Sequence, residues 1–395
     1  MREIVTEARQ TEVRQLTAQD VVMASTNEDG SLRRVLRPPL HSLTSTRFFA
    51  AFYVMLYHFA SRPAYRAGAP ALLVRFLSNG HMGVPFFFIL SGFILSYSYL
   101  GQLRFGKERR RFWEARFSRV YPVYLLSLLI DWPFRGQITV GAQLAILTAT
   151  QTWNPAKGYL AQAWNFPAWT LSVEAFFYLS FPLLLPICAK LRRRSQIACI
   201  GLLCAVVVLL HTSIPLDRLG PIDASILHWI PLPIVRLPEF VLGIFVALRL
   251  IDSPKKGNPL RIGLYLLVAL VMLSVLDSPW LSLITLPYLG LIYELGADKS
   301  WFTKALSWRP LVFLGGASYS IYLLQYPIRN WVRFLCEKSL RAPYIVGSLL
   351  SPPLLICVAC LVFHFYEEPM RRILKRVFSA LEFHRQTLRQ AWPWI

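Results

Sequence analysis

Residues 82–100 read MGVPFFFILSGFILSYSYL, and this stretch decides the fold class of the protein. It holds 19 residues without one charged side chain, which is close to the length that a helix needs to cross a bilayer. Comparable apolar stretches recur along the chain, at 47–61, 119–132, 140–153, 169–189, 196–212, 226–250, 261–277, 279–296, 310–330 and 343–365. The sequence therefore predicts an all-α protein, a polytopic helical bundle embedded in a lipid bilayer.

The composition supports a membrane protein and argues against other classes. Charged residues make up only 16% of the 395 residues, whereas roughly 25% is usual in soluble domains. The 26 Phe, 17 Tyr and 12 Trp argue against disorder, and six cysteines are too few for a disulfide scaffold. Cys357 and Cys360 form a C-x-x-C inside an apolar run, where we expect them to pack between helices. No metal site is predicted.

The strong positive charge is typical of the loops of a membrane protein rather than of a nucleic-acid-binding surface. There are 42 Lys and Arg against 21 Asp and Glu, a formal net charge of +21. The basic residues cluster beside apolar segments, in 104–119, 192–194, 255–256 and 371–372. Loops with an excess of Lys and Arg stay in the cytoplasm, so this pattern predicts which loops lie inside.

The predicted topology has about ten crossings, with both termini in the cytoplasm and the chain in the inner, cytoplasmic membrane of the cell. Segments 119–132 and 140–153 are each too short for a full crossing. We read 119–153 as one net crossing with a re-entrant or interfacial piece, although two crossings stay open. The predicted parts are a polar N-terminal tail at 1–40, a membrane domain at 41–375 and a short basic tail at 376–395.

Ionisable side chains inside apolar segments are costly and point to function. Arg47 and His58 lie eleven residues apart, so on a helix they share one face and are separated by roughly 16 Å along the axis. Glu174 is followed by fifteen residues without Asp, Glu, Lys, Arg or His, so its carboxylate must pair, protonate or face a polar cavity. Glu239 has a simpler reading, because Arg236 three residues earlier is a natural ion-pair partner.

Two further patterns suggest a ligand and close packing. Arg116 and Arg119 lie on one helical face and present planar donors that suit phosphate groups, although they also fit ordinary cytoplasmic loop charge. Gly83, Ser91 and Gly92 allow close helix approach within the apolar stretch at 82–100.

Taken together, these motifs resemble membrane acyltransferase family 3, the integral-membrane O-acyltransferases of polysaccharides and related molecules. The resemblance covers roughly residues 40–375. Its motifs are Arg47-x10-His58, the Gly83–Phe93 run, Arg116-x-x-Arg119, Trp169-x-Leu-Ser-x-Glu174-x-x-Phe-Tyr178, Ser318–Leu323 and Glu368-Pro369. Two positions depart from the family pattern: Gln325, where His is frequent, and Pro85, where a polar residue is frequent.

The resemblance implies about ten helices and transfer of an acyl group from acyl-CoA, expected to be acetyl-CoA, to a hydroxyl of a carbohydrate acceptor. In that scheme His58 is the general base, and Glu174 orients it or stabilises its charged form. Arg116 and Arg119 bind the CoA phosphates, and Arg47 lies at the entry of the pantetheine arm. Gly83, Ser91 and Gly92 line a narrow passage for that arm. Gln325 receives no proton-transfer role, and a covalent acyl relay stays open beside direct transfer.

Two other functions stay open at the level of sequence. One is acylation of a small secondary metabolite of the macrolide type. The other is a proton-coupled transporter or flippase in which Arg47, His58 and Glu174 form a proton relay. Transporters often contain inverted repeats, and none is apparent here. Binding of acyl-CoA would separate an enzyme from a transporter.

Overall fold

The computed structural model describes residues 37–103, 106–155, 160, 163–213, 230–254, 256–277, 280–339 and 344–391. Every regular element within these ranges is a helix, which confirms the predicted all-α class. Most of the predicted N-terminal tail, residues 1–36, lies outside the described residues. The predicted boundary at residue 41 coincides with the first residue of helix α2.

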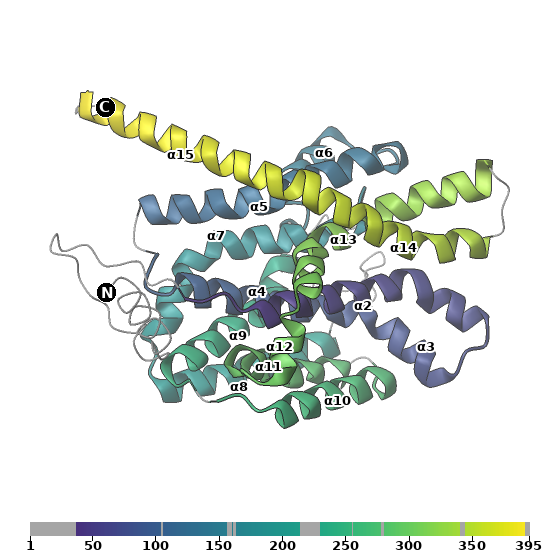
Figure 1. The fold of residues 1–395 in the computed structure, drawn as a ribbon, viewed down its shortest axis with the longest axis horizontal. Coiled ribbons are helices and arrows are strands. Elements are labelled where there is room, and N and C mark those ends of the chain that lie inside the picture. The colour runs from purple at the N-terminus through teal and green to yellow at the C-terminus, as the bar shows by residue number, and fades with distance from the viewer. Residues whose placement is uncertain are drawn as a thin grey trace, which may run out of the picture.

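Eleven of the described helices have thirteen or more residues. They are α2 (His41–Arg66), α4 (Gly83–Tyr99), α5 (Lys107–Asp131), α7 (Trp169–Lys190), α8 (Arg193–Ser213), α9 (Leu232–Asp252), α10 (Pro259–Val275), α11 (Thr285–Ala297), α13 (Arg309–Arg333), α14 (Tyr344–Val362) and α15 (Glu368–Ala391). Three helices are short: α3 (Ala71–Ser78), α6 (Val140–Leu147) and α12 (Trp301–Leu306). Helices α2, α4, α5 and α7 run roughly along the long axis of the molecule (Figure 1).

Six continuous helical segments among the described residues are long and apolar enough to cross a membrane. They are Ala71–Tyr99, Phe166–Lys190, Arg193–Leu210, Trp280–Ala297, Arg309–Cys336 and Val346–His384. Helix α10 is apolar but shorter. Helices α2, α5 and α9 do not qualify, because polar and charged residues interrupt them. The structure thus supports a multi-pass bundle, while the number of ten crossings stays a prediction.

The segment at 119–153 is divided unequally between two helices. Its first part belongs to α5, which begins earlier than the apolar run, at Lys107, and is 25 residues long. Its second part forms α6, which has 8 residues and is therefore only about 12 Å long. A helix of that length is too short to span the apolar layer. This is compatible with a re-entrant or interfacial piece.

The C-terminal boundary predicted at residue 375 falls inside a helix. α15 continues to Ala391 and packs along α5. Glu382 accounts for this continuation, because its carboxylate pairs with Lys107 at 3.0 Å and with Arg111 at 2.8 Å. Glu382 thus ties this part of α15 to α5, while the division into a membrane domain and a C-terminal tail stays a prediction. The last four residues, 392–395, lie outside the described part of the chain.

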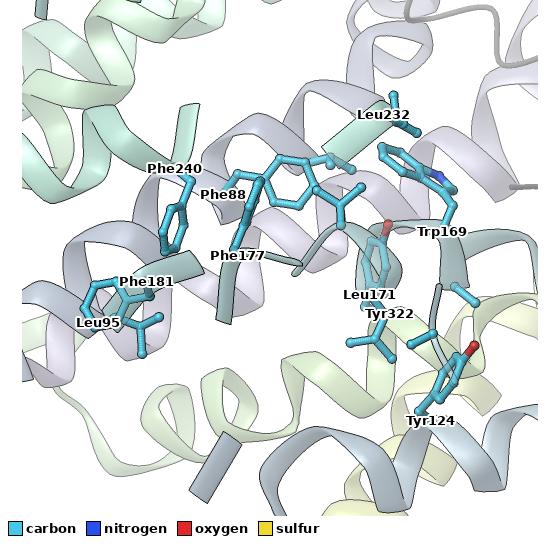
Figure 2. Close-up of a cluster of buried hydrophobic side chains, with 14 of the residues drawn as sticks. Phe88, Leu95, Tyr124, Trp169, Leu171, Phe177, Phe181, Leu232, Phe240 and Tyr322 are labelled. Carbon is cyan, nitrogen blue, oxygen red and sulfur yellow. The ribbon is translucent and has the colours of Figure 1, made fainter. Parts of the chain in front are cut away.

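Helices α4 and α9 form a close contact in the bundle. A methyl group added at Gly92 would lie 2.0 Å from the carbonyl oxygen of Phe240, and one added at Gly243 would lie 1.9 Å from that of Ile89. Beside this contact, the rings of Phe177 and Phe240 stack with their centroids 4.6 Å apart (Figure 2). The two glycines therefore bring the backbones together, and aromatic rings fill the space around them.

Replacing Gly92 with alanine is expected to destabilise the protein, because the added methyl group overlaps a backbone atom that cannot rotate away. Overpacking of this kind typically costs about 1–3 kcal/mol. The measurement is the melting temperature of the purified protein in detergent. Gly201→Ala on α8 is the matched control, since nothing lies within 4 Å of the methyl group it adds. Equal melting temperatures for the two variants would contradict the close approach of α4 and α9.

Candidate functional site

A cavity of about 940 Å³ lies among helices α2, α4, α5, α7, α13 and the start of α15. Charged residues line it at the end of the bundle where α2, α5 and α13 begin, which we call the basic end. Its lining includes six arginines, Arg37, Arg47, Arg116, Arg119, Arg309 and Arg371, but only two glutamates, Glu174 and Glu368. The cavity therefore favours an anionic ligand.

Three of these arginines come from two helices and have no carboxylate within ion-pair distance. Arg47 lies on α2, and Arg116 and Arg119 lie one turn apart on α5. Within the described ranges, none of the three forms an ion pair at 4.0 Å or less. Arg116 instead lies over the rings of Tyr99 and Phe112, at 5.8 and 5.9 Å from their centroids. Their guanidinium groups are thus available to a ligand.

Glu174 lies on α7 in the wall of the same cavity. Its carboxylate accepts a hydrogen bond of 3.0 Å from the hydroxyl of Tyr178, one helical turn away. Its charge also interacts with those of Arg47, Arg116 and Arg119. The structure therefore brings four of the predicted site residues together, from three motifs that each lie more than 50 residues from the next in the sequence.

A fifth ionisable residue of this cluster, Glu367, was not singled out from the sequence. Its carboxylate accepts a hydrogen bond of 2.6 Å from Ser320 on α13, and its charge interacts with those of Arg119 and Arg47. The Tyr319 hydroxyl donates to the carbonyl of Val120 at 3.0 Å, which ties α13 to α5 next to Arg119. The signal available in the sequence is an acid close after the apolar run at 343–365 and directly before the Glu368-Pro369 motif.

The opposite end of the cavity is mostly apolar. The last lining residues of each helix on that side are Val84 and Phe87 of α4, Thr170 of α7, and Tyr322 and Leu323 of α13. Figure 2 shows Tyr322 beside Leu171, and both residues belong to the same buried hydrophobic cluster. The lining on α13 extends from Arg309 to Leu323, which is roughly 21 Å along the helix. The cavity thus changes from cationic to apolar along its length.

His58 is not among the residues that line this cavity. It shares a face of α2 with Arg47 but lies about 16 Å further along the helix. Its imidazole ring packs edge-on against Tyr326 and Phe166, with centroid distances of 5.2 and 5.8 Å. The nearest charged group in these contacts is Arg329, which donates to the backbone carbonyl of His58 at 3.5 Å.

The proposed contact between Glu174 and His58 is not formed in the described structure. The partners of Glu174 are Tyr178 and the arginines, whereas the charges that interact with His58 are those of Arg329 and His81. The orienting role of Glu174 toward His58 therefore has no structural support. The structure instead places Glu174 in the cluster of arginines.

Two of the three small residues predicted to line a passage do not line it. Ser91 is part of the cavity wall, whereas Gly83 and Gly92 are not. A methyl group at Gly83 would lie 2.7 Å from a side-chain carbon of Val54 on α2, and Gly92 faces α9. The physical reason is that each glycine lies where two helices approach most closely, so no space is left for a ligand.

Glu239 forms the ion pair with Arg236 that the sequence predicts. Its carboxylate pairs with Arg236 at 2.8 Å, and both side chains are buried. Removing either partner would leave an isolated charge in the bundle, so this pair is structural. No group of three or more His, Cys, Asp or Glu side chains is placed to hold a metal ion in the described ranges.

Replacing Glu174 with glutamine is expected to lower the melting temperature, because the amide keeps the shape of the side chain but leaves three arginine charges without their nearby carboxylate. Loss of one partner of a fully buried ion cluster typically costs about 3–5 kcal/mol, and less where a cavity admits solvent. Glu114→Gln is the control, since Glu114 pairs with Arg110 outside the cavity. A stable Glu174→Gln protein with normal acyl-CoA binding and strongly reduced transfer would instead assign Glu174 to catalysis.

Comparison with known proteins gives matches over most of the chain. A family model described as an acyltransferase domain matches residues 40–364. Acyltransferase MdmB from Streptomyces mycarofaciens is 30% identical over 318 residues, which cover 75% of this chain and 80% of MdmB. O-acetyltransferase OatA from Staphylococcus aureus is 25% identical over 386 residues, which cover 87% of this chain but only 58% of OatA. No solved structure gives a significant match.

Proposed function

This chain belongs to the acyltransferase family whose model matches residues 40–364, and on that premise we propose that it transfers an acyl group from acyl-CoA to a hydroxyl of a carbohydrate acceptor. It is a multi-pass membrane acyltransferase. The proposed acyl group is acetyl, which the similarity to the O-acetyltransferase OatA supports. The proposed location is the inner membrane, with both termini in the cytoplasm.

The observation that carries the donor proposal is the set of unpaired arginines facing the cavity. Coenzyme A carries several phosphate groups, and guanidinium groups bind phosphate through two parallel hydrogen bonds. Arg116 and Arg119 present two such groups one helical turn apart, and Arg47 adds a third from α2. By the positive-inside rule, the basic end of the bundle is proposed to face the cytoplasm, where acyl-CoA is found.

The proposed reaction needs little besides proton transfer and stabilisation of an oxyanion, because a thioester is already activated. The acceptor oxygen bonds to the acyl carbon, the bond between that carbon and sulfur breaks, and the products are an ester and CoA. His58 would accept the proton of the acceptor hydroxyl and return it to the departing thiolate. A neutral imidazole suits this role, because its ordinary pKa lies close to physiological pH.

Glu174 receives a different proposed role from the one that its spacing suggested. As a carboxylate among Arg47, Arg116 and Arg119, it is proposed to hold the three side chains toward the cavity wall in the absence of donor. The roles of His58 and of the arginines in this scheme are proposals that the family motifs support, and the position of the arginines in the cavity wall supports theirs.

The proposed function is tested with purified protein in detergent, radiolabelled acetyl-CoA, and a panel of oligosaccharides and hydroxylated small molecules. We expect an acid-stable label on one of the oligosaccharides, with release of one free thiol for each label. Label on a small-molecule product instead would favour the metabolite alternative. Failure to bind acetyl-CoA in equilibrium dialysis would overturn the donor assignment and favour the transporter.

A further inference from the structure

We propose that Phe87 and Tyr322 form a constriction that selects the acyl group by size on its way from the cavity to His58. This inference rests on the proposed function, because it assumes that the cavity holds the acyl donor. It adds a specificity determinant to that function: the two rings would admit a short acyl group and hold back a longer one.

The first observation is the gap between the end of the cavity and His58. The lining on α13 ends at Leu323. Arg329, which donates to the carbonyl of His58, lies six residues beyond it, roughly 9 Å further along the helix. An acyl carbon held in the cavity must therefore move past the last lining residues before a proton acceptor at His58 can serve the reaction.

The second observation is that two aromatic rings meet where the cavity ends. Phe87 of α4 and Tyr322 of α13 lie with their centroids 6.0 Å apart and their planes at 69°, an edge-to-face contact. Tyr322 is buried within the hydrophobic cluster, which holds its ring in place. Phe87 is only half-buried, whereas its neighbours Phe86 and Phe88 are buried, so it is the ring of the three with free space beside it. The pair is contributed by separate helices and can open without unfolding either.

The third observation is a polar group just beyond this pair. Gln325 is completely buried, and within the described residues neither its amide oxygen nor its amide nitrogen has a hydrogen-bond partner. It lies on α13 one turn before Arg329, and helical side chains lean back toward the N-terminus of their helix, which here is the cavity side. A buried amide without a hydrogen-bond partner is costly. The carbonyl oxygen of a passing acyl group would accept a hydrogen bond from the N–H of this amide.

These three features define a route that is apolar at the constriction and polar beyond it. A thioester carbonyl with a short chain would pass the two rings and meet the Gln325 amide on the way to His58. A longer chain would press against the Phe87 ring. Pocket contacts of this kind discriminate by roughly 10- to 200-fold for each methylene group.

The test compares acetyl-, butyryl- and hexanoyl-CoA as donors to the acceptor that the unmodified protein labels from acetyl-CoA. In Phe87→Ala we expect the ratio of kcat/KM for hexanoyl-CoA over acetyl-CoA to rise at least about tenfold. In Phe87→Trp we expect acetyl transfer to fall at least about tenfold while the Kd for acetyl-CoA changes less than about twofold. Phe87→Leu serves as the second enlarging variant if the alanine variant does not fold.

Phe313→Ala is the matched control, because Phe313 lines the same cavity near its basic end and should leave the chain-length ratio unchanged. The same ratio in all four proteins would overturn the constriction, provided the unmodified protein transfers acetyl. If the unmodified protein transfers nothing from any acyl-CoA, the proposed function itself fails. A changed ratio in Phe313→Ala equal to that in Phe87→Ala would also overturn the inference, since selectivity would then not depend on this point of the cavity.

Discussion

Replacing His58 with alanine is expected to abolish acyl transfer while the protein keeps its fold and its affinity for acyl-CoA. A positioned general base typically contributes about 10²- to 10⁴-fold to the rate, so the remaining activity should lie near the detection limit. The fold should survive, because His58 is half-buried and contacts its surroundings through edge-to-face packing with aromatic rings and a hydrogen bond to its backbone carbonyl. Alanine retains that carbonyl and therefore the contact with Arg329.

The measurements for His58→Ala are turnover with labelled acetyl-CoA, the Kd for acetyl-CoA and the melting temperature, all on one preparation. Unchanged affinity is a specific expectation here, because His58 lies outside the cavity that we assign to the donor. His364→Ala is the control, since His364 is exposed and also lies outside the cavity. Substantial turnover in His58→Ala would exclude His58 as the base or as a covalent acyl carrier.

Replacing Arg116 and Arg119 together with alanine is expected to cause the largest loss of acyl-CoA affinity. One charge-assisted contact to phosphate is worth about 1.5–3 kcal/mol, or roughly 10- to 150-fold in Kd. Each single variant should show a loss in that range, and the double variant should lose more than either. Arg119→Lys should recover only part of the affinity, because an ammonium group cannot form the two parallel bonds of a guanidinium.

Equilibrium dialysis with acetyl-CoA measures this effect without knowledge of the acceptor. The affinity of the unmodified protein should fall with rising salt concentration, and this dependence should weaken in the double variant. Arg193→Ala is the control, since Arg193 is an exposed arginine on α8 outside the cavity. Unchanged Kd values in both single variants and in the double variant would leave the two arginines as determinants of membrane topology only.

The structure changes how the predicted site residues are grouped. Spacing placed Arg47 and His58 on one face of α2, and helical geometry supports that. The cavity nevertheless includes Arg47 and excludes His58, because it ends where Phe87 meets Tyr322. Glu174, predicted as a partner of His58, lies with the arginines instead. Spacing along the sequence identified candidate site residues, but it did not predict which of them lie in contact in the folded protein.

The sequence by itself determined the fold class, the membrane location and the family, and it predicted the limits of α4, α7, α8, α10, α13 and α14 to within about three residues. Uncharged stretches near the length of a bilayer crossing admit few structures, because backbone groups in lipid must be satisfied within a helix. The residue types and order of the motifs predicted the family, and the family model that matches residues 40–364 confirmed it. Local features of this kind depend only on neighbours along the chain.

Tertiary structure alone decided which helix each polar face meets. Gly83 and Gly92 read as passage residues in the sequence, yet they lie where α2 and α9 approach α4 too closely for a ligand. Glu367 lies in the arginine cluster, although none of the sequence motifs contains it. The physical reason is that periodicity defines directions around one helix, whereas the neighbour in each direction is set by how closely the backbones of distant segments can pack.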